Sequence, residues 1–343
     1  MTQIDFPIGQ NFSKQELKAQ FHLIKSIPYN NPELAYKILI PKGWENEALQ
    51  AESKDLNPNT LKPLGIFKGP AEGGANPFIQ IQAVQLLREI TAANWLRHYA
   101  VATERKIIAM KPVSNNFSDS IMEFQIQGYP FTARATASID GNRLFFLLNL
   151  ALSSTYPKYK EIFGVPVVSF NLQKLSGKPS IEKPLSYDLK GIVRFAYPGS
   201  WQCRPLTEKR PRGKEAVDLF SYDPEGNLCG RIRVKTVEKA ISKNTETQIQ
   251  DTMAEYRDGN IIAGKLLESI EVEIGAERFD SAVVKAYRAQ IEGNEIEQEL
   301  WIAVIEEPKY SIIVSLLTLF REQAFYIWAI NHRAYYMILE TLA

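Results

Sequence analysis

The sequence predicts an α+β protein that contains two copies of one domain, each an antiparallel sheet covered by helices. First, the segments IPKGWE (40–45) and YPGSWQ (197–202) both place Pro-x-x-Trp directly after an alternating apolar run. Second, each is followed by two apolar segments joined by a polar Glu-Gly loop, the pattern of a β-hairpin. Third, a helix, three strands and a closing helix then follow in the same order twice, which indicates a duplication.

The composition is that of a globular protein with two domains. The chain has 343 residues, of which 45% are apolar and 23% are charged. Its 40 Lys and Arg residues against 39 Asp and Glu residues give a formal charge of +1. Because the chain as a whole is nearly neutral, it has no overall field that would hold a nucleic acid or an acidic membrane surface.

The sequence predicts a cytoplasmic protein with no membrane span. The stretch MTQIDFPIGQNFSK lacks the basic and apolar regions of a secretory signal. The longest apolar stretches without charge, 144–157 and 310–320, are shorter than the roughly 20 residues that cross a bilayer. Cys203 and Cys229 belong to no disulfide framework, and two reduced thiols are favoured over a single bridge.

Four segments divide the chain. Residues 1–30 are interpreted as a helical extension outside both copies, with a helix over 11–26 because Ser13 and Glu16 fit a capping box. The first copy is assigned to 31–172, the linker to 173–189 and the second copy to 190–343. The linker has two prolines and no sustained apolar periodicity.

The predicted elements follow the same order in both copies. The first copy has a helix at 90–100, strands at 120–127, 131–139 and 143–151, and a closing helix at 156–172. The second copy has a helix at 242–256, strands at 281–291, 295–305 and 309–318, and a closing helix at 322–342. The alignment sets FIQIQAV (78–84) on RIRVKTV (231–237) and Ile66-Phe67 on Leu219-Phe220.

The repeated Pro-x-x-Trp is explained by architecture. Proline ends a strand because it removes a ladder donor, and a tryptophan three residues later can fold over the end of the sheet and pack on a helix. Trp44 and Trp201 are therefore interpreted first as parts of the core. The alternative, in which either ring stacks on a ligand or partner, stays open.

Taken with this order of elements, the segments IPKGWE, YPGSWQ, VVSF (167–170) and MILETL (337–342) resemble the PsbP-like superfamily, which includes PsbP, the yeast Ran-release factor Mog and the bacterial DcrB-like proteins. The resemblance implies two tandem α/β/α sandwich domains. It also implies binding rather than catalysis, since members dock on protein assemblies and a bacterial branch is similar to secretion chaperones. The tandem arrangement and the lack of a signal peptide or lipobox depart from the family pattern and argue against a periplasmic DcrB-like role.

No catalytic or metal-binding motif is found. His22, His98 and His332 have no metal-ligand spacing, and the sequence has no nucleophile elbow or phosphate loop. The glycine-rich segment 69–77 is interpreted as a hairpin loop. Four carboxylates are interpreted as the wet face of a strand: Glu268, Glu271, Glu273 and Glu277. We expect no catalytic residue, no metal and no cofactor.

One basic cluster lies in CRPLTEKRPRGKEA (203–216). It comprises Arg204, Lys209, Arg210, Arg212 and Lys214. Five cations in so short a stretch could bind phosphates or an acidic partner, although a solvated loop between strands is the simpler interpretation. Because the cluster has no aromatic residue on which bases could stack, no nucleic-acid partner is expected.

The function that the sequence favours is a non-catalytic protein-binding module of the assembly-factor, adaptor or secretion-chaperone type. A partner would lie on a sheet face or in an inter-domain groove. The candidate partner-binding residues are Trp44, Trp201, Tyr326 and Tyr336. Two alternatives stay open: a small-molecule or lipid carrier with a pocket between sheet and helix, and an enzyme with a site at the domain junction that uses His332 or His98. The oligomeric state is not predicted.

Overall fold

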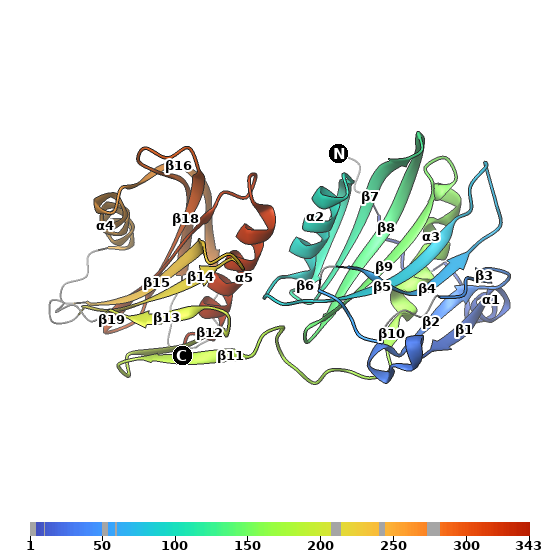
Figure 1. Cartoon of the computed structure of the whole chain (residues 1–343), viewed down its shortest axis with the longest axis horizontal. Helices are drawn as coiled ribbons and strands as arrows, with labels where there is room; N and C mark the ends of the chain where they lie inside the picture. Colours follow the sequence, from blue (N-terminus) through green and yellow to red (C-terminus); the bar gives the residue numbers. More distant parts are fainter. Residues whose placement is uncertain are drawn as a thin grey trace. The chain divides into compact units, whose positions relative to one another are not determined.

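The computed structural model describes residues 5–9, 11–49, 54–58, 60–206, 214–239, 244–272 and 282–343. The chain forms two compact units, Met1–Leu87 with Thr91–Ile181 and Arg88–Ile90 with Glu182–Ala343. The boundary between Ile181 and Glu182 lies inside the predicted linker 173–189. Each unit is built on a seven-stranded antiparallel sheet (Figure 1), which confirms the α+β class.

The first sheet has its strands in the order β3-β4-β5-β9-β8-β7-β6. Their bounds are β3 (Glu45–Asn46), β4 (Lys62–Lys68), β5 (Phe78–Gln85), β9 (Arg143–Leu152), β8 (Tyr129–Asp140), β7 (Phe117–Ile126) and β6 (Lys106–Ser114). Helix α2 (Ala92–Ala102) packs on one face and helix α3 (Tyr156–Ser169) on the other (Figure 1). Successive strand residues point to opposite faces, so Phe146 contacts Trp95 of α2 while Phe145 joins the core cluster that includes Tyr159 of α3.

The second sheet repeats this order as β13-β14-β15-β19-β18-β17-β16. The bounds are β13 (Gln202–Pro205), β14 (Lys214–Tyr222), β15 (Leu228–Glu238), β19 (Tyr310–Leu319), β18 (Glu297–Glu306), β17 (Ala282–Ile291) and β16 (Ile261–Val272). Helix α4 (Thr245–Asp258) packs on β16 and β18, and helix α5 (Phe325–Thr341) packs on β15 and β19 from the opposite face (Figure 1). None of the helices in the described part of the chain is both long and apolar enough to span a bilayer.

Each unit also has a small sheet that precedes the large one. In the first unit, β1 (Phe21–Ser26), β2 (Tyr36–Pro41) and β10 (Asn171–Leu172) pair, and two short 3₁₀ helices, η1 (Pro28–Asn30) and η2 (Pro32–Leu34), lie between β1 and β2. In the second unit, β11 (Pro184–Leu189) pairs antiparallel with β12 (Val193–Pro198). The predicted linker therefore includes a strand.

The predicted helix over 11–26 is wrong beyond residue 20. Helix α1 (Lys14–Gln20) has the expected capping box between Ser13 and Glu16, but none of its residues is buried. Residues Phe21–Ser26 instead pair with β2 along their whole length and bury Phe21. Pairing with a strand that is distant in sequence outweighs local helical spacing here, because the buried strand β2 offers an unpaired edge.

The large sheet of each unit has four long strands after helix α2 or α4. The sequence predicted three of them in the first copy, and in the second copy it predicted three together with a wet-faced strand around Glu268. Strand β6 was missed because it has two register shifts and contains Pro112, which remove the two-residue alternation. The wet-faced strand predicted around Glu268 corresponds to β16, an edge strand with mostly exposed residues. Glu273 and Glu277 lie outside the described residues.

The tryptophan of the first Pro-x-x-Trp packs as the architectural interpretation expects. Pro41 ends β2, and the amide of Trp44 donates to the Pro41 carbonyl. The half-buried Trp44 ring lies 6.3 Å from the rings of both Tyr159 and Phe163 on α3. A Cβ on Gly69 would lie 2.7 Å from the indole, so this position requires glycine.

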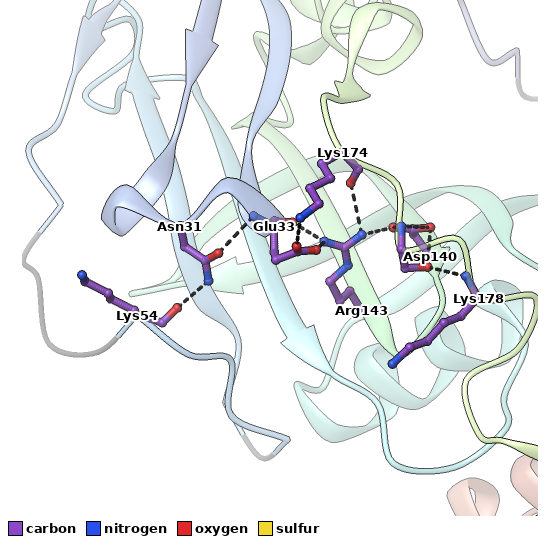
Figure 2. A network of polar contacts seen from close by, with 8 residues as sticks. Asn31, Glu33, Lys54, Asp140, Arg143, Lys174 and Lys178 are labelled. Atoms are coloured by element: carbon purple, nitrogen blue, oxygen red, sulfur yellow. Dashed lines mark hydrogen bonds and ion pairs between the residues drawn. The ribbon is translucent and has the colours of Figure 1, made fainter.

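A polar network closes the end of the first sheet (Figure 2). Arg143 of β9 donates to the Glu33 carboxylate at 3.0 Å, to Asp140 and to the carbonyl of Lys174. Asp140 in turn accepts from the amide and hydroxyl of Ser176. These contacts anchor the segment after α3 to the sheet.

The interiors of the two sheets differ along one matched row of residues. Arg134 of β8 is 1% exposed, lies 2.6 Å from Asp119 of β7 and donates to the carbonyl of Pro7. Arg134 pairs with Asn149, which pairs with Ile79; in the second unit the corresponding row contains Trp301, Leu316 and Ile232. A buried ion pair in one unit thus corresponds to an indole in the other.

Candidate functional site

The three strands β13, β14 and β15 have one closed and one open face. On the face toward α5, Val217, Leu219 and Ile232 are completely buried. On the opposite face, α4 packs farther along the sheet, on β16 and β18, and Phe220 and Tyr222 remain half-exposed.

The pairing register of β13, β14 and β15 places a set of charged and aromatic side chains side by side on this open face. Arg204 pairs with Asp218, which pairs with Arg233, and Gln202 pairs with Phe220, which pairs with Arg231. Directly paired residues on neighbouring strands point to the same face. We call this surface the arginine face and define it by Gln202, Arg204, Asp218, Phe220, Tyr222, Arg231 and Arg233.

Asp218 braces two of the three arginines. Its side chain is 4% exposed, and its oxygens accept from Arg231 at 2.8 Å and from Arg233 at 2.7 and 2.9 Å. One carboxylate therefore serves two guanidinium groups. The arginines remain partly open to solvent, with exposed side-chain fractions of 26% for Arg231 and 19% for Arg233.

Phe220 is flanked by cations from both neighbouring strands. The guanidinium carbons of Arg204 and Arg231 lie 5.2 and 6.0 Å from its ring centroid, within the range of cation–π attraction. Arg204 donates to Gln202 Oε1 at 3.2 Å and to the Tyr222 hydroxyl at 3.4 Å. Within the described part of the chain Arg204 makes no ion pair, so its charge faces neutral acceptors alone.

Helix α4 reaches the β15 side of the arginine face. Lys235, two residues beyond Arg233 on β15, is paired with Glu255 of α4 at 2.8 Å. The same carboxylate lies 3.9 Å from Arg233. The guanidinium carbon of Arg231 lies 5.9 Å from the Tyr256 ring of α4. Helix α4 thus neutralises Lys235 and borders Arg231, and Arg204 lies on the other side of Phe220, on β13.

The sequence singled out Arg204 but missed the rest of the arginine face. Lys209, Arg210 and Arg212 lie outside the described residues, and Lys214 is the first residue of β14. The missed signal is RIRVK (231–235), in which every second residue of an inner strand is cationic. That alternation indicates a strand with one charged face.

The four predicted partner-binding residues are divided between the two units. Trp44 is in the first unit and packs on α3, and Trp201 is 5% exposed and belongs to the core of the second unit. Tyr326 and Tyr336 are half-buried on α5. The Tyr336 ring lies 4.7 Å from that of His332, and burial raises the pKa of Tyr336 to about 12.

A second charged cluster lies beneath α5, and its carboxylate already accepts hydrogen bonds from the groups around it. Glu299 is completely buried and accepts from the indole nitrogens of Trp301 and Trp328, each at 2.9 Å. Arg321 adds its Nε at 2.6 Å, its Nη2 at 2.8 Å and its backbone amide at 3.2 Å. These five donors on the Glu299 carboxylate hold the start of α5 on the sheet. The His332 ring stacks on the Trp328 ring at a centroid distance of 4.5 Å.

The groups relevant to the alternative functions are not among the residues that define the arginine face. Burial lowers the pKa of His98 on α2. Cys203 and Cys229 are free thiols, and burial raises the pKa of both. No group of three or more His, Cys, Asp or Glu side chains in the described ranges is arranged to hold a metal ion.

A cavity of about 360 Å³ lies along the β16–β17 hairpin. Among its lining residues are four charged ones, Lys265, Arg288, Glu292 and Glu297. Its lining residues belong to β16, β17, β18 and the turn between β17 and β18, and none of them is on a helix, so this cavity is not the pocket between sheet and helix that the carrier alternative requires.

The matched face of the first unit has different side chains. Glu45 pairs with Lys68 one residue after Trp44, and Gln202 pairs with Phe220 one residue after Trp201. The positions that correspond to Gln202, Arg204, Asp218, Phe220, Arg231 and Arg233 are thus Glu45, Glu47, Ile66, Lys68, Phe78 and Gln80. Lys68 is paired with Glu47. The predicted alignment of Ile66-Phe67 with Leu219-Phe220 was wrong by one residue, since Phe67 corresponds to Leu219.

Comparison with known proteins gives matches to solved structures alone. No family model matches the chain, and no curated protein matches it. The solution structure of cyanobacterial PsbP from Synechocystis sp. PCC 6803 is 15% identical, covers 50% of this chain and 99% of its own, and has a TM-score of 0.33. The immunity protein TplEi of the type VI secretion system from Pseudomonas aeruginosa is 11% identical in its apo form, covers 93% of this chain and 96% of its own, and has a TM-score of 0.24. A PsbP structure thus matches half of a chain that has two sheets of the same strand order, and similarities at this level say nothing about what the chain binds.

Proposed function

We propose that this chain is a non-catalytic protein-binding module that holds a partner on the arginine face of its second unit. The supporting observation is the half-exposed Phe220 ring flanked by Arg204 and Arg231 on an open sheet face. Aromatic rings and arginines provide much of the binding energy at protein interfaces, because they combine large contact area with directional donors.

Several features favour binding over catalysis on this face. The residues that define it include no cysteine, serine or histidine that could act as a nucleophile or base, and Asp218 is occupied by two arginines. General acid–base chemistry needs a group that can reach a reacting atom in a changeable protonation state. The Asp218 carboxylate instead orients the two guanidinium groups and balances part of their charge.

The proposal also covers the domain family and the cellular role of the chain. We infer two tandem PsbP-like domains in a cytoplasmic adaptor, assembly factor or secretion chaperone. The resemblance of IPKGWE and YPGSWQ to that superfamily supports a docking role. The second unit is the binding copy in this proposal, and the first unit is its structural companion.

A capture experiment with matched variants tests the proposal. The whole chain, the Arg204→Ala/Phe220→Ala variant and a Glu47→Ala/Lys68→Ala variant of the matched face in the first unit would each be used to capture partners from lysate of the native host. We expect the wild type and the first-unit variant to retain the same protein, and the second-unit variant to lose it. Circular dichroism and thermal unfolding check that all three are folded. Retention of the partner by the Arg204/Phe220 variant would overturn the proposal.

A further inference from the structure

We infer that the arginine face recognises an acidic, extended segment of a partner protein that carries an apolar side chain beside its carboxylates. This inference rests on the proposed function and specifies the chemistry of the partner.

The charge balance selects an anionic partner. The face has three arginines and one aspartate, and that aspartate is 4% exposed. The chain as a whole is close to neutral, with a formal charge of +1, so the excess is local to this surface. A local patch attracts a local group of carboxylates over about one Debye length, roughly 8 to 10 Å at physiological salt.

The hydrogen-bond donors that the arginines still have available favour carboxylates as the anionic groups of the partner. A guanidinium group has five N–H donors in a plane, and it binds a carboxylate through two parallel hydrogen bonds. The two contacts of Arg204, at 3.2 and 3.4 Å, are with neutral oxygens that a carboxylate would replace with a shorter, charge-assisted bond. Arg231 Nε is buried and has no hydrogen-bond partner, whereas its Nη2 is bound to Asp218. Arg204 is therefore the main anchor, and Arg231 is the second cation.

The aromatic ring selects a peptide over a simple anion. Phe220 lies between the two cations, and the Tyr222 ring is 6.5 Å from it. An apolar side chain next to a carboxylate would cover this ring surface and exclude water from the arginine–carboxylate contacts. Inorganic phosphate would use the donors but leave the rings exposed. A nucleic acid would need a series of stacking rings, and this face offers Phe220 and Tyr222 within a chain that is nearly neutral.

Binding of short labelled peptides to the full-length protein tests this inference without the natural partner. The probe is an extended peptide that alternates glutamate with leucine or phenylalanine, and its control is the same peptide with glutamine in place of glutamate. Fluorescence anisotropy would be measured at low and at physiological ionic strength. We expect the acidic peptide to bind at least about tenfold more tightly than the glutamine peptide, with an affinity that falls as salt is added.

Matched variants locate the binding to the arginine face. Arg204→Gln should weaken binding of the acidic peptide about tenfold, since one charge-assisted pair is lost. Phe220→Ala should weaken it less and should reduce the preference for apolar over alanine residues in the peptide. Lys68→Gln, which removes a cation from the matched face of the first unit, should leave the affinity unchanged and serves as the control for loss of a positive charge.

The outcomes separate the inference from the proposed function. Equal affinity for the two peptides, or an Arg204→Gln variant with wild-type affinity, overturns the inference. So does inorganic phosphate or an RNA oligomer that binds through Arg204 while the acidic peptide does not. If a captured partner depends on the arginine face but is not displaced by the acidic peptide, the proposed function stands and the inference fails. If the peptide binds as expected but no protein depends on the face in lysate, the inference stands and the proposed function fails.

Discussion

Across six matched positions of the open sheet face, the first unit carries two glutamates and one lysine, whereas the second unit carries three arginines and one aspartate. The strand order is the same in both sheets, and each sheet has its closing helix on the opposite face. The matched residues are Glu45, Glu47, Ile66, Lys68, Phe78 and Gln80 in the first unit and Gln202, Arg204, Asp218, Phe220, Arg231 and Arg233 in the second.

This difference separates what the fold requires from what it leaves free. The buried faces of both units are apolar at matched positions, such as Phe67 and Leu219, because each must pack against a closing helix. The open faces have no such constraint, and their charges have opposite signs. A surface that varies while its scaffold stays the same is where a tandem protein can give its two copies different roles.

The largest expected effect concerns the interior of the first unit. Arg134→Met leaves Asp119 buried without its partner, and burial already raises the pKa of this carboxyl group. We expect a loss of about 3 to 5 kcal/mol in the free energy of unfolding of the first unit, measured by urea denaturation. The matched control is Arg204→Met on the surface of the second unit, which should change stability by less than about 0.5 kcal/mol.

A double variant completes this test. Replacing both partners, as in Arg134→Met with Asp119→Leu, removes the uncompensated charge and should recover most of the lost stability. A single Arg134→Met variant as stable as the wild type would mean that the pairing of Arg134 with Asp119 does not stabilise the first unit.

The next effect sharpens the contrast between the open faces. Asp218→Asn removes the single carboxylate of the arginine face while keeping its shape, so acidic peptide should bind several-fold more tightly. The same change should destabilise the second unit by about 1 to 3 kcal/mol, because bonds to Arg231 and Arg233 lose their charge assistance. Peptide anisotropy and urea denaturation measure the two effects.

Glu45→Gln is the control for this variant, since it removes one negative charge from the matched face of the first unit. It should leave peptide affinity unchanged. Equal gains from the two variants would show that net charge, rather than the arginine face, governs the binding.

The smallest effect is a pH dependence confined to the first unit. Burial lowers the pKa of His98 below its usual 6.5, so the folded state binds fewer protons than the unfolded state as the pH falls through that value. The first unit should therefore lose stability on acidification from about pH 7.5 to about pH 5.5, and His98→Gln should lose less. Thermal unfolding at the two pH values measures the difference, and identical pH dependence in the two proteins would contradict the assignment.

The sequence predicted the order of elements well because each is encoded locally. Capping residues mark the starts of α1 and α4, and alternating apolar runs mark the inner strands. Strand β1 was missed, since it forms through pairing with β2 rather than through its own pattern. The one-residue error at Phe67 had a larger consequence, because a slip of one residue moves a side chain to the opposite face of the sheet.

The candidate site could be predicted only in part for the same reason. Arg204 stood out because it lies in a basic run, whereas Arg231 and Arg233 were hidden in a strand that was assigned by its apolar residues. The position of Arg204, Arg231 and Arg233 around Phe220 depends on the register of β13, β14 and β15, which come from separate segments of the chain. Register of this kind is fixed by pairing in the folded sheet, and no single segment encodes it.

The brace that Asp218 provides has a consequence for the entropy of association. A free arginine side chain loses up to about 2 kcal/mol of rotamer freedom when it is fixed in a complex. Arg231 and Arg233 have lost much of that freedom on folding, since three hydrogen bonds hold them to Asp218. A segment that meets these two side chains finds them already oriented, and Arg204 alone remains to be ordered when the complex forms.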